Sequence, residues 1–282
     1  MTKLAHCFTK DTVFKMTFSK NPGLLKRLVA TLLGIDYLSI SKFVVTNSEM
    51  PPEELESKFC HLDINMRVDG RIVNLEIQVD SVKHEFIPRS LYHWAREYSS
   101  ALLSGTDSHY SMLPETIVIS IVDFPLFIKP EFYSKFQLVD ISKPYTGCYE
   151  VLTEKCTLLY YELKKHPAIK DRDDYLGLWM ALFAAKTEED IRRIEQLEVP
   201  VMTQTIEAYR KTVTSAEFIE IEKARDKGRV AWMYAEAAAL KRGEELGEAR
   251  GEARSDAKWQ AVVADKDALI ASLQAQLGES VD

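Results

Sequence analysis

Hydrophobic and polar residues alternate over residues 62–79, on either side of the pair Asp69-Gly70. Asp-Gly between two alternating runs is a strong signal for a β-hairpin with a two-residue turn. Successive side chains of a strand point to opposite faces, so this hairpin has one apolar face and one polar face. Counting back from the turn places Asp63 directly opposite Glu76 on the polar face.

The polar face of this hairpin has two interpretations. Like charges that face each other destabilise a strand pair, so two carboxylates need a cation, a shared proton or full exposure to water. A hard divalent ion such as Mg²⁺ is a natural partner, because it is held by one or two carboxylates together with waters and phosphate oxygens. Otherwise the face is simply the solvated side of an antiparallel sheet. The polar residues are His61, Asp63, Asn65, Asn74, Glu76 and Gln78.

The first half of the chain otherwise predicts helices and strands in a mixed α/β arrangement. Glu115–Phe124 is almost continuously apolar and β-branched, which marks a central strand covered on both faces. Asn21-Pro22 and Gly34 bracket an apolar-periodic helix as its start and its C-cap. We also expect helices at 8–18 and from Pro88 to Gly105, strands at Ser39–Asn47, Phe132–Val139 and Cys148–Tyr161, and an acidic loop at Glu49–Ser57.

From about Asp173 the pattern becomes helical. The glycines of the last segment recur every four residues among Glu and Arg, a spacing that lets a second helix approach closely, so we expect this tail to self-associate. A flexible, partly helical charged tail is the alternative. Helices are predicted through Leu176–Phe183, Ile191–Leu197, Val201–Thr212 and 216–277, with glycines at Gly243, Gly247 and Gly251 and apolar positions from Trp259 to Leu277. We divide the chain into a mixed α/β domain at 1–165, a helical subdomain at 173–215 and a helical tail at 216–282.

Composition narrows the class of protein. With 46% hydrophobic and 28% charged residues, the chain has the balance of a soluble globular protein. No stretch reaches the roughly 18 uncharged apolar residues of a membrane span, and the N-terminus lacks the apolar run of a signal peptide. The cysteines form no CxxC pair, which argues against a zinc site or a disulfide framework and favours the cytoplasm. They are Cys7, Cys60, Cys148 and Cys156.

Charge is distributed unevenly along the chain. The net charge is −7, but residues 1–30 carry an excess of basic side chains over the single acid Asp11. A basic block beside an acidic hairpin face suits a phosphate substrate and a metal, whereas a solvated helix surface is the alternative. The basic residues are Lys3, Lys10, Lys15, Lys20, Lys26 and Arg27.

Several segments, taken in this order, resemble the PD-(D/E)XK nuclease superfamily, specifically its branch of PD-(D/E)XK nuclease family transposases, or recombination-promoting nucleases. The resemblance covers residues 8 to about 130 and, more loosely, the tail. It implies a restriction-endonuclease-like mixed sheet flanked by helices, followed by an all-helical C-terminal region with a long tail helix. The segments are Asp11-Thr-Val-Phe-Lys15, Leu62-Asp63-Ile64, Leu75-Glu76-Ile77-Gln78, Arg89-Ser-Leu-Tyr92 and Ile121-Val-Asp123-Phe124.

The resemblance implies a catalytic metal site on the hairpin. Asp63 and Glu76 would bind Mg²⁺, with Mn²⁺ or Ca²⁺ as substitutes, together with the backbone carbonyl of Ile77. Gln78 stands where the superfamily often has lysine. Its amide brings no charge, but it can orient the attacking water. Asp11 would contribute to a second ion site or shape the first.

The same resemblance suggests substrate-binding residues. Lys15 and Arg89 would contact phosphate, and Tyr92 would pack behind Arg89. Asp11 and Lys15 are also spaced as a surface ion pair four residues apart, and Tyr92 could simply belong to the core.

The implied function is a metal-dependent DNA endonuclease that hydrolyses phosphodiester bonds and promotes DNA recombination or mobile-element activity. DNA would be the partner, and the C-terminal helix would join copies of the chain into a homo-oligomer, with no membrane involved. The alternative is a catalytically inactive, oligomeric DNA-binding or regulatory protein.

Overall fold

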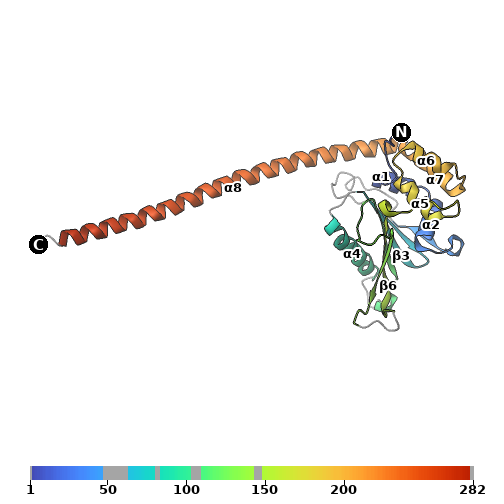
Figure 1. Ribbon diagram of the computed structural model, residues 1–282, viewed down its shortest axis with the longest axis horizontal. Coiled ribbons are helices and arrows are strands. Elements are labelled where there is room, and N and C mark those ends of the chain that lie inside the picture. The colour runs from blue at the N-terminus through green and yellow to red at the C-terminus, as the bar shows by residue number, and fades with distance from the viewer. Residues whose placement is uncertain (1, 47–62, 80–82, 103–108, 143–147, 280–282) are drawn as a thin grey trace. The chain divides into compact units, whose positions relative to one another are not determined.

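The computed structural model describes residues 2–46, 63–79, 83–102, 109–142 and 148–279 (Figure 1). The chain divides into two units, Met1–Arg225 and Asp226–Asp282. The first unit holds the sheet and most of the helices. The second unit consists of the greater part of one long helix.

The described residues form a six-stranded mixed sheet in the order β1-β2-β3-β4-β6-β5. β3 and β4 are parallel, as are β4 and β6, whereas the outer pairs are antiparallel. All residues of β4 are buried, which confirms the predicted central strand. The strands are β1 (Phe43–Val45), β2 (Ile64–Val68), β3 (Arg71–Gln78), β4 (Thr116–Val122), β5 (Tyr133–Val139) and β6 (Val151–Glu162).

The hairpin of β2 and β3 has the predicted register. Val68 pairs with Arg71 and Ile64 pairs with Leu75. Asp69 and Gly70 both have positive φ, 48° and 86°, as a type I′ turn requires. The local alternation of the sequence therefore places the polar residues of both strands on one face.

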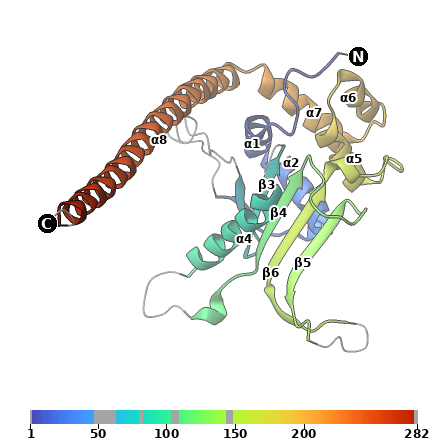
Figure 2. The same cartoon turned by 60° about the vertical axis from the view of Figure 1, so that its left-hand side comes forward.

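The two faces of the sheet are covered by different helices (Figure 2). On one face, apolar residues of the strands join α1 (Asp11–Ser19), α2 (Pro22–Leu33) and α5 (Tyr175–Ala184) in the main core. On the other face, α4 (Lys83–Ser100) lies against β4. The apolar cluster on the α4 face consists of Phe86, Val118, Val122, Phe124, Cys156, Leu158 and Tyr160.

The helices of the main core begin and end at their sequence signals. In α2, Pro22 occupies the first turn and Gly34 is a C-cap with a φ of 65°. Thr187 and Asp190 form a capping box at the start of α6 (Glu188–Glu195). α7 (Pro200–Val213) follows, and residues from α5, α6 and α7 belong to the same core cluster as the strands. The division of the chain at 165 and 215 stays a prediction.

Two predicted elements differ from the structure. α4 begins at Lys83, so Pro88 lies inside the helix and does not open it. Proline is tolerated there because packing of the helix on the sheet outweighs the lost backbone hydrogen bond. β1 is shorter than predicted, because a 3-10 turn (η1, Tyr37–Ser39) occupies the start of that segment. The acidic loop at 49–57 and the predicted helix end at Gly105 lie outside the described residues.

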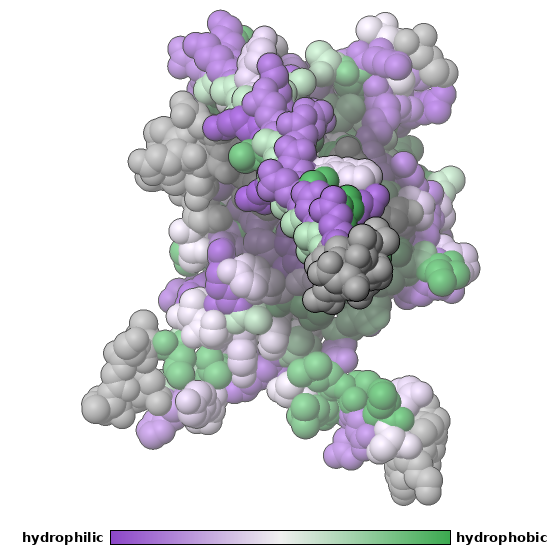
Figure 3. All heavy atoms as spheres, turned by 90° about the vertical axis from the view of Figure 1, so that its left-hand side faces the viewer, coloured by the Kyte–Doolittle hydropathy of each residue, from purple (hydrophilic) through white to green (hydrophobic). Residues whose placement is uncertain are grey.

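The far end of β5 and β6 carries exposed apolar side chains (lower right in Figure 3). Alternation predicts that one side of a covered ribbon is buried, yet here residues of both orientations are exposed. The ribbon therefore extends past the helices that cover the rest of the sheet. These residues are Phe136, Leu138, Val139, Ile141, Val151 and Leu152.

α8 (Ala216–Glu279) is continuous through both units. Its first turns belong to the first unit, where Arg225 donates two hydrogen bonds of 2.9 Å to the carboxylate of Asp11. In the second unit the described side chains are nearly all exposed, including Trp259 and Leu269. Within the described residues, no helix is both long and apolar enough to cross a bilayer.

Candidate functional site

The candidate site lies on the face of the sheet that α4 covers. It is built from three strands whose side chains alternate, so that every second residue faces the helix. Glu76 of β3 is in register with Ser120 of β4. From α4, Arg89 and His93 lie one helical turn apart, Arg89 near Glu76 and His93 near Asp63.

Glu76 is the most deeply buried acid of this hairpin, with 3% of its surface exposed. Its Oε1 accepts a 2.8 Å hydrogen bond from the Ser120 hydroxyl, and its Oε2 lies 3.7 Å from the Arg89 guanidinium. Burial, and after it the charge of Asp63, raises the pKa of the Glu76 carboxyl to about 7, against the opposing effects of Arg89 and Ser120. The site therefore holds a carboxylate that favours a nearby cation.

Asp63 precedes β2 and lies close enough to Glu76 for their charges to interact. Its side chain is 13% exposed, and its Oδ2 lies 3.9 Å from Nδ1 of His93. Burial lowers the pKa of His93, although Asp63 opposes this effect. The two acids that the hairpin register places opposite each other are thus close in space.

Arg89 connects α4 with the end of β3. Besides lying near Glu76, its guanidinium donates a 3.0 Å hydrogen bond to Oε1 of Gln78 and stacks over the ring of Phe86 at 4.9 Å. The positive charge that Gln78 lacks is therefore supplied beside it by a residue of the covering helix. Ile77 points its side chain into the main core, so only its backbone can contribute to the site.

The interpretation of the polar face as a solvated surface is wrong for its centre. Asn74 and Glu76 are 2% and 3% exposed, and Asn74 donates a 2.6 Å hydrogen bond to Asn65. The cause is tertiary, because α4 covers a face that the hairpin alone would leave open to water. His61, which was expected on this face, lies outside the described residues.

The three other predicted site residues are Asp11, Lys15 and Tyr92, and two of the alternatives for them are wrong. Asp11 uses both carboxylate oxygens for Arg225, and Lys15 is 2% exposed, so the alternative of a surface ion pair between them is wrong. Tyr92 is 62% exposed, which excludes core packing for that side chain, and its ring contacts His93. A contact of Lys15 or Tyr92 with substrate, and a metal role for Asp11, stay predictions.

Sequence reasoning missed the residues that support the acids from other elements. Ser120 lies in a strand that reads as uniformly apolar core, and His93 is one of two histidines in the sequence of α4. The only sequence signal for Ser120 is a small hydroxyl residue in the middle of a β-branched run. Its role depends on the parallel pairing of β3 with β4, which local patterns do not reveal.

The donors at the site suit a hard divalent cation. Two neighbouring carboxylates are the protein share of a typical Mg²⁺ site, whose remaining positions are taken by water and phosphate oxygens. The described residues contain no cluster of three or more His, Cys, Asp or Glu side chains arranged to hold a metal.

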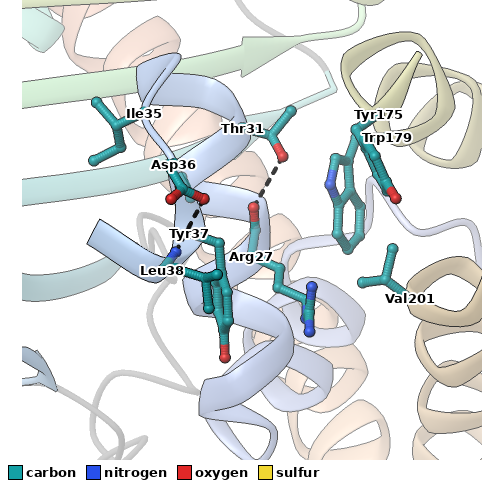
Figure 4. A pocket seen from close by; sticks show the side chains of 10 residues that line it. Arg27, Thr31, Ile35, Asp36, Tyr37, Leu38, Tyr175, Trp179 and Val201 are labelled. Carbon is teal, nitrogen blue, oxygen red and sulfur yellow. Dashed lines mark hydrogen bonds between the residues drawn. The ribbon is translucent and has the colours of Figure 1, made fainter. Parts of the chain in front are cut away.

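A separate pocket of ≈ 440 Å³ lies on the other side of the first unit, between α2, η1 and α5 (Figure 4). Its Arg27 guanidinium stacks over Tyr37 at 4.2 Å. Trp179 at its wall is fully buried, so the indole offers no open surface to a ligand. The pocket contains none of the residues of the candidate site on the α4 face. The lining residues are Arg27, Ala30, Thr31, Ile35, Asp36, Tyr37, Leu38, Tyr175, Trp179 and Val201.

Comparison with known proteins agrees with this arrangement. The family described as PD-(D/E)XK nuclease family transposase matches residues 8–239, which include the sheet, the α4 face and the start of the tail. No curated protein and no solved structure shows significant similarity to the chain. The mixed sheet flanked by helices and the long C-terminal helix are consistent with the PD-(D/E)XK fold. The chain therefore belongs to the PD-(D/E)XK nuclease family transposases.

Proposed function

We propose that the protein is a metal-dependent DNA endonuclease that hydrolyses phosphodiester bonds at the α4 face of its sheet. The observation that carries this proposal is the pair of neighbouring acids, the buried Glu76 and the partly buried Asp63, with Arg89 beside them. Burial of two interacting carboxylates is costly unless a cation occupies the site for part of the working cycle. Membership of a nuclease family is consistent with phosphodiester chemistry.

The residues divide the work by their chemistry. Asp63, Glu76 and the backbone carbonyl of Ile77 would hold Mg²⁺, for which Mn²⁺ or Ca²⁺ are candidate substitutes. When bound, the ion lowers the pKa of a water and stabilises the charge that develops on the phosphate. Gln78 would orient the attacking water through its amide. Both carboxylate oxygens of Asp11 are bonded to Arg225, so we place Asp11 outside the main set.

Arg89 would bind the phosphate that is cleaved or its neighbour. Its planar guanidinium suits phosphate, and it already lies 3.7 Å from the Glu76 carboxylate. We also propose that Lys15 and the exposed Tyr92 contribute to DNA binding, Tyr92 by stacking or by a phosphate contact through its hydroxyl.

Cleavage of supercoiled plasmid tests the proposal directly. We expect nicking or linearisation by the wild type in Mg²⁺, none in EDTA, and none by Glu76→Gln. Glu115→Gln is the matched control, because Glu115 also pairs with an arginine, Arg71, but at the opposite end of β3. DNA binding without cleavage in Mg²⁺, Mn²⁺ or Ca²⁺ would instead support an inactive DNA-binding or regulatory protein.

We also propose that α8 joins copies of the chain into a homo-oligomer and that the nuclease serves DNA recombination or mobile-element activity. A single exposed helix buries no apolar surface, whereas an assembled one does. Sedimentation of the full chain, compared with a Leu269→Lys, Leu273→Glu variant, tests the first point. Equal sedimentation of both proteins as monomers would contradict it. The exposed apolar residues of α8 include Val230, Met233, Tyr234, Leu240, Leu246, Trp259, Val263, Leu269, Ile270 and Leu273.

A further inference from the structure

We infer that Ser120, Tyr160 and Ser90 are positioning residues that fix the Glu76 carboxylate and the Arg89 guanidinium for the reaction. This inference rests on the proposed function and concerns side chains outside the hairpin that carries the acids. All three are buried, with 0%, 2% and 0% of their surfaces exposed. They touch neither bulk water nor substrate, so they would act through Glu76 and Arg89.

Ser120 and Tyr160 continue the row that begins at Glu76. Glu76 pairs with Ser120 across β3 and β4, and Ser120 pairs with Tyr160 across β4 and β6. Residues in register on neighbouring strands point to the same face. Three adjacent strands thus present a carboxylate and two hydroxyls in one line beneath α4.

Ser120 distinguishes the two oxygens of Glu76. Its hydroxyl donates to Oε1 at 2.8 Å, whereas Oε2 is the oxygen near Arg89. A hydrogen bond to one oxygen restricts rotation of the carboxylate about its terminal bond, which is otherwise a soft torsion. Oε2 is therefore held toward the Arg89 guanidinium, and both groups keep a fixed position at the site.

Tyr160 and Ser90 fix the covering helix. Their hydroxyl oxygens lie 2.6 Å apart, and Ser90 also donates to the backbone carbonyl of Ile87 at 2.9 Å. A serine hydroxyl has one proton, so Tyr160 is the donor to Ser90. Because Ser90 follows Arg89 directly, this bond sets the position of the arginine relative to the strands.

The ring and the hydroxyl of Tyr160 have separable roles. The ring packs edge-on against Phe86, Phe127 and Phe136, which is ordinary core packing. The hydroxyl alone reaches Ser90, so Tyr160→Phe removes the positioning contact and leaves the ring. Tyr161→Phe is a matched control, because Tyr161 is the next residue, points to the other face and donates its buried hydroxyl to the carbonyl of Leu32.

The test uses the full chain and three measurements: Mn²⁺ affinity by calorimetry, plasmid cleavage, and thermal unfolding. Groups that orient metal ligands typically cost 10–100-fold in affinity or activity when they are removed. We expect Ser120→Ala to weaken Mn²⁺ binding by about 10-fold or more, and Ser120→Thr to restore it because the hydroxyl returns. Tyr160→Phe should lower kcat by about 10-fold, while Tyr161→Phe lowers thermal stability to a similar extent and leaves kcat unchanged.

Each outcome decides a separate point. Mn²⁺ binding by the wild type that is unchanged in Ser120→Ala would overturn the role of Ser120 and leave the proposed function standing. Equal kcat in Tyr160→Phe and Tyr161→Phe would overturn the role of the Tyr160 hydroxyl. If Ser120→Ala does not fold, this comparison of the two tyrosine variants still tests the inference. A wild type that neither binds Mn²⁺ nor cleaves would overturn the proposed function and this inference together.

Discussion

The two faces of the central sheet are built from the same strands but differ in the side chains they bury. Leu75 and Ile77 of β3 enter the main core, whereas Glu76, between them, faces α4. The core face gathers apolar side chains from α1, α2 and α5 to α7, and the α4 face combines a small apolar cluster with buried polar groups. Stability is thus concentrated on one face, and the groups suited to chemistry lie on the other.

This difference shows how the fold can tolerate an unfavourable site. Burial of Glu76 opposes its ionisation, and a large apolar core on the reverse of the same strands offsets such a cost. Polar groups on the α4 face are also bonded to one another, as Ser120 is to Glu76 and Ser90 is to Tyr160. Changes on the two faces should therefore affect different measurements.

The largest expected effect is on cleavage by Glu76→Gln. Loss of one of two metal-binding carboxylates removes transition-state stabilisation of several kcal/mol, so kcat should fall by roughly 1000-fold or more. Far-ultraviolet circular dichroism and the unfolding transition should remain those of a folded protein. A kcat of Glu76→Gln within about 10-fold of the wild-type value would contradict the assignment of Glu76 to the catalytic site.

A neighbouring change on the core face should have the opposite profile. Leu75 is fully buried, so Leu75→Ala should lower the free energy of unfolding by about 2–5 kcal/mol. Below the melting temperature of the variant, kcat per folded molecule should stay within a few-fold of wild type. Chemical denaturation and plasmid cleavage measure the two quantities. A large loss of kcat in folded Leu75→Ala would mean that the faces are not separable.

The difference in the pH dependence of stability between the wild type and Glu76→Gln reports on the α4 face. The pKa of Glu76 is raised from its ordinary 4.5 to about 7, so the folded state binds this proton more tightly than the unfolded state. The stabilisation is fully present below pH 4.5 and is lost as pH rises through about 7, a change on the order of 3 kcal/mol.

In EDTA, urea unfolding should show the wild type losing stability between about pH 5 and pH 8, while Glu76→Gln shows a smaller loss. The glutamine variant is the control because it keeps the shape of the side chain and removes its titration. Parallel pH profiles for the two proteins would contradict the raised pKa.

The smallest expected effect concerns the ion pair of Asp11 and Arg225, which borders the core face. Both side chains are about a quarter exposed, so Arg225→Ala should cost about 1 kcal/mol in the free energy of unfolding. Lys241→Ala in the exposed part of α8 should cost less than about 0.5 kcal/mol, because Lys241 and Glu245 are 77% and 63% exposed. Equal losses in the free energy of unfolding from the two substitutions would show that partial burial does not strengthen the Asp11–Arg225 ion pair.

The sequence alone determined the features that depend on neighbours along the chain. The Asp69-Gly70 turn specified the hairpin register, because few residues adopt the positive φ angles that this turn needs. Pro22 and Gly34 specified the ends of α2 for similar conformational reasons. The alternation of the hairpin then gave Asp63 and Glu76 as neighbours, and uniform burial of β4 followed from its apolar composition.

Only the tertiary structure decided which of these groups became buried and what supports them. Arg225 reaches Asp11 across 214 positions of sequence, and Ser120 meets Glu76 across 44. These contacts depend on parallel strand pairing and on helix packing, which bring distant segments together and leave little local trace. The covering of the polar face by α4 is of the same kind. It turned two acids that a hairpin would expose to water into a largely buried pair, because Phe86 and Trp94 of α4 pack against the apolar cluster on this face.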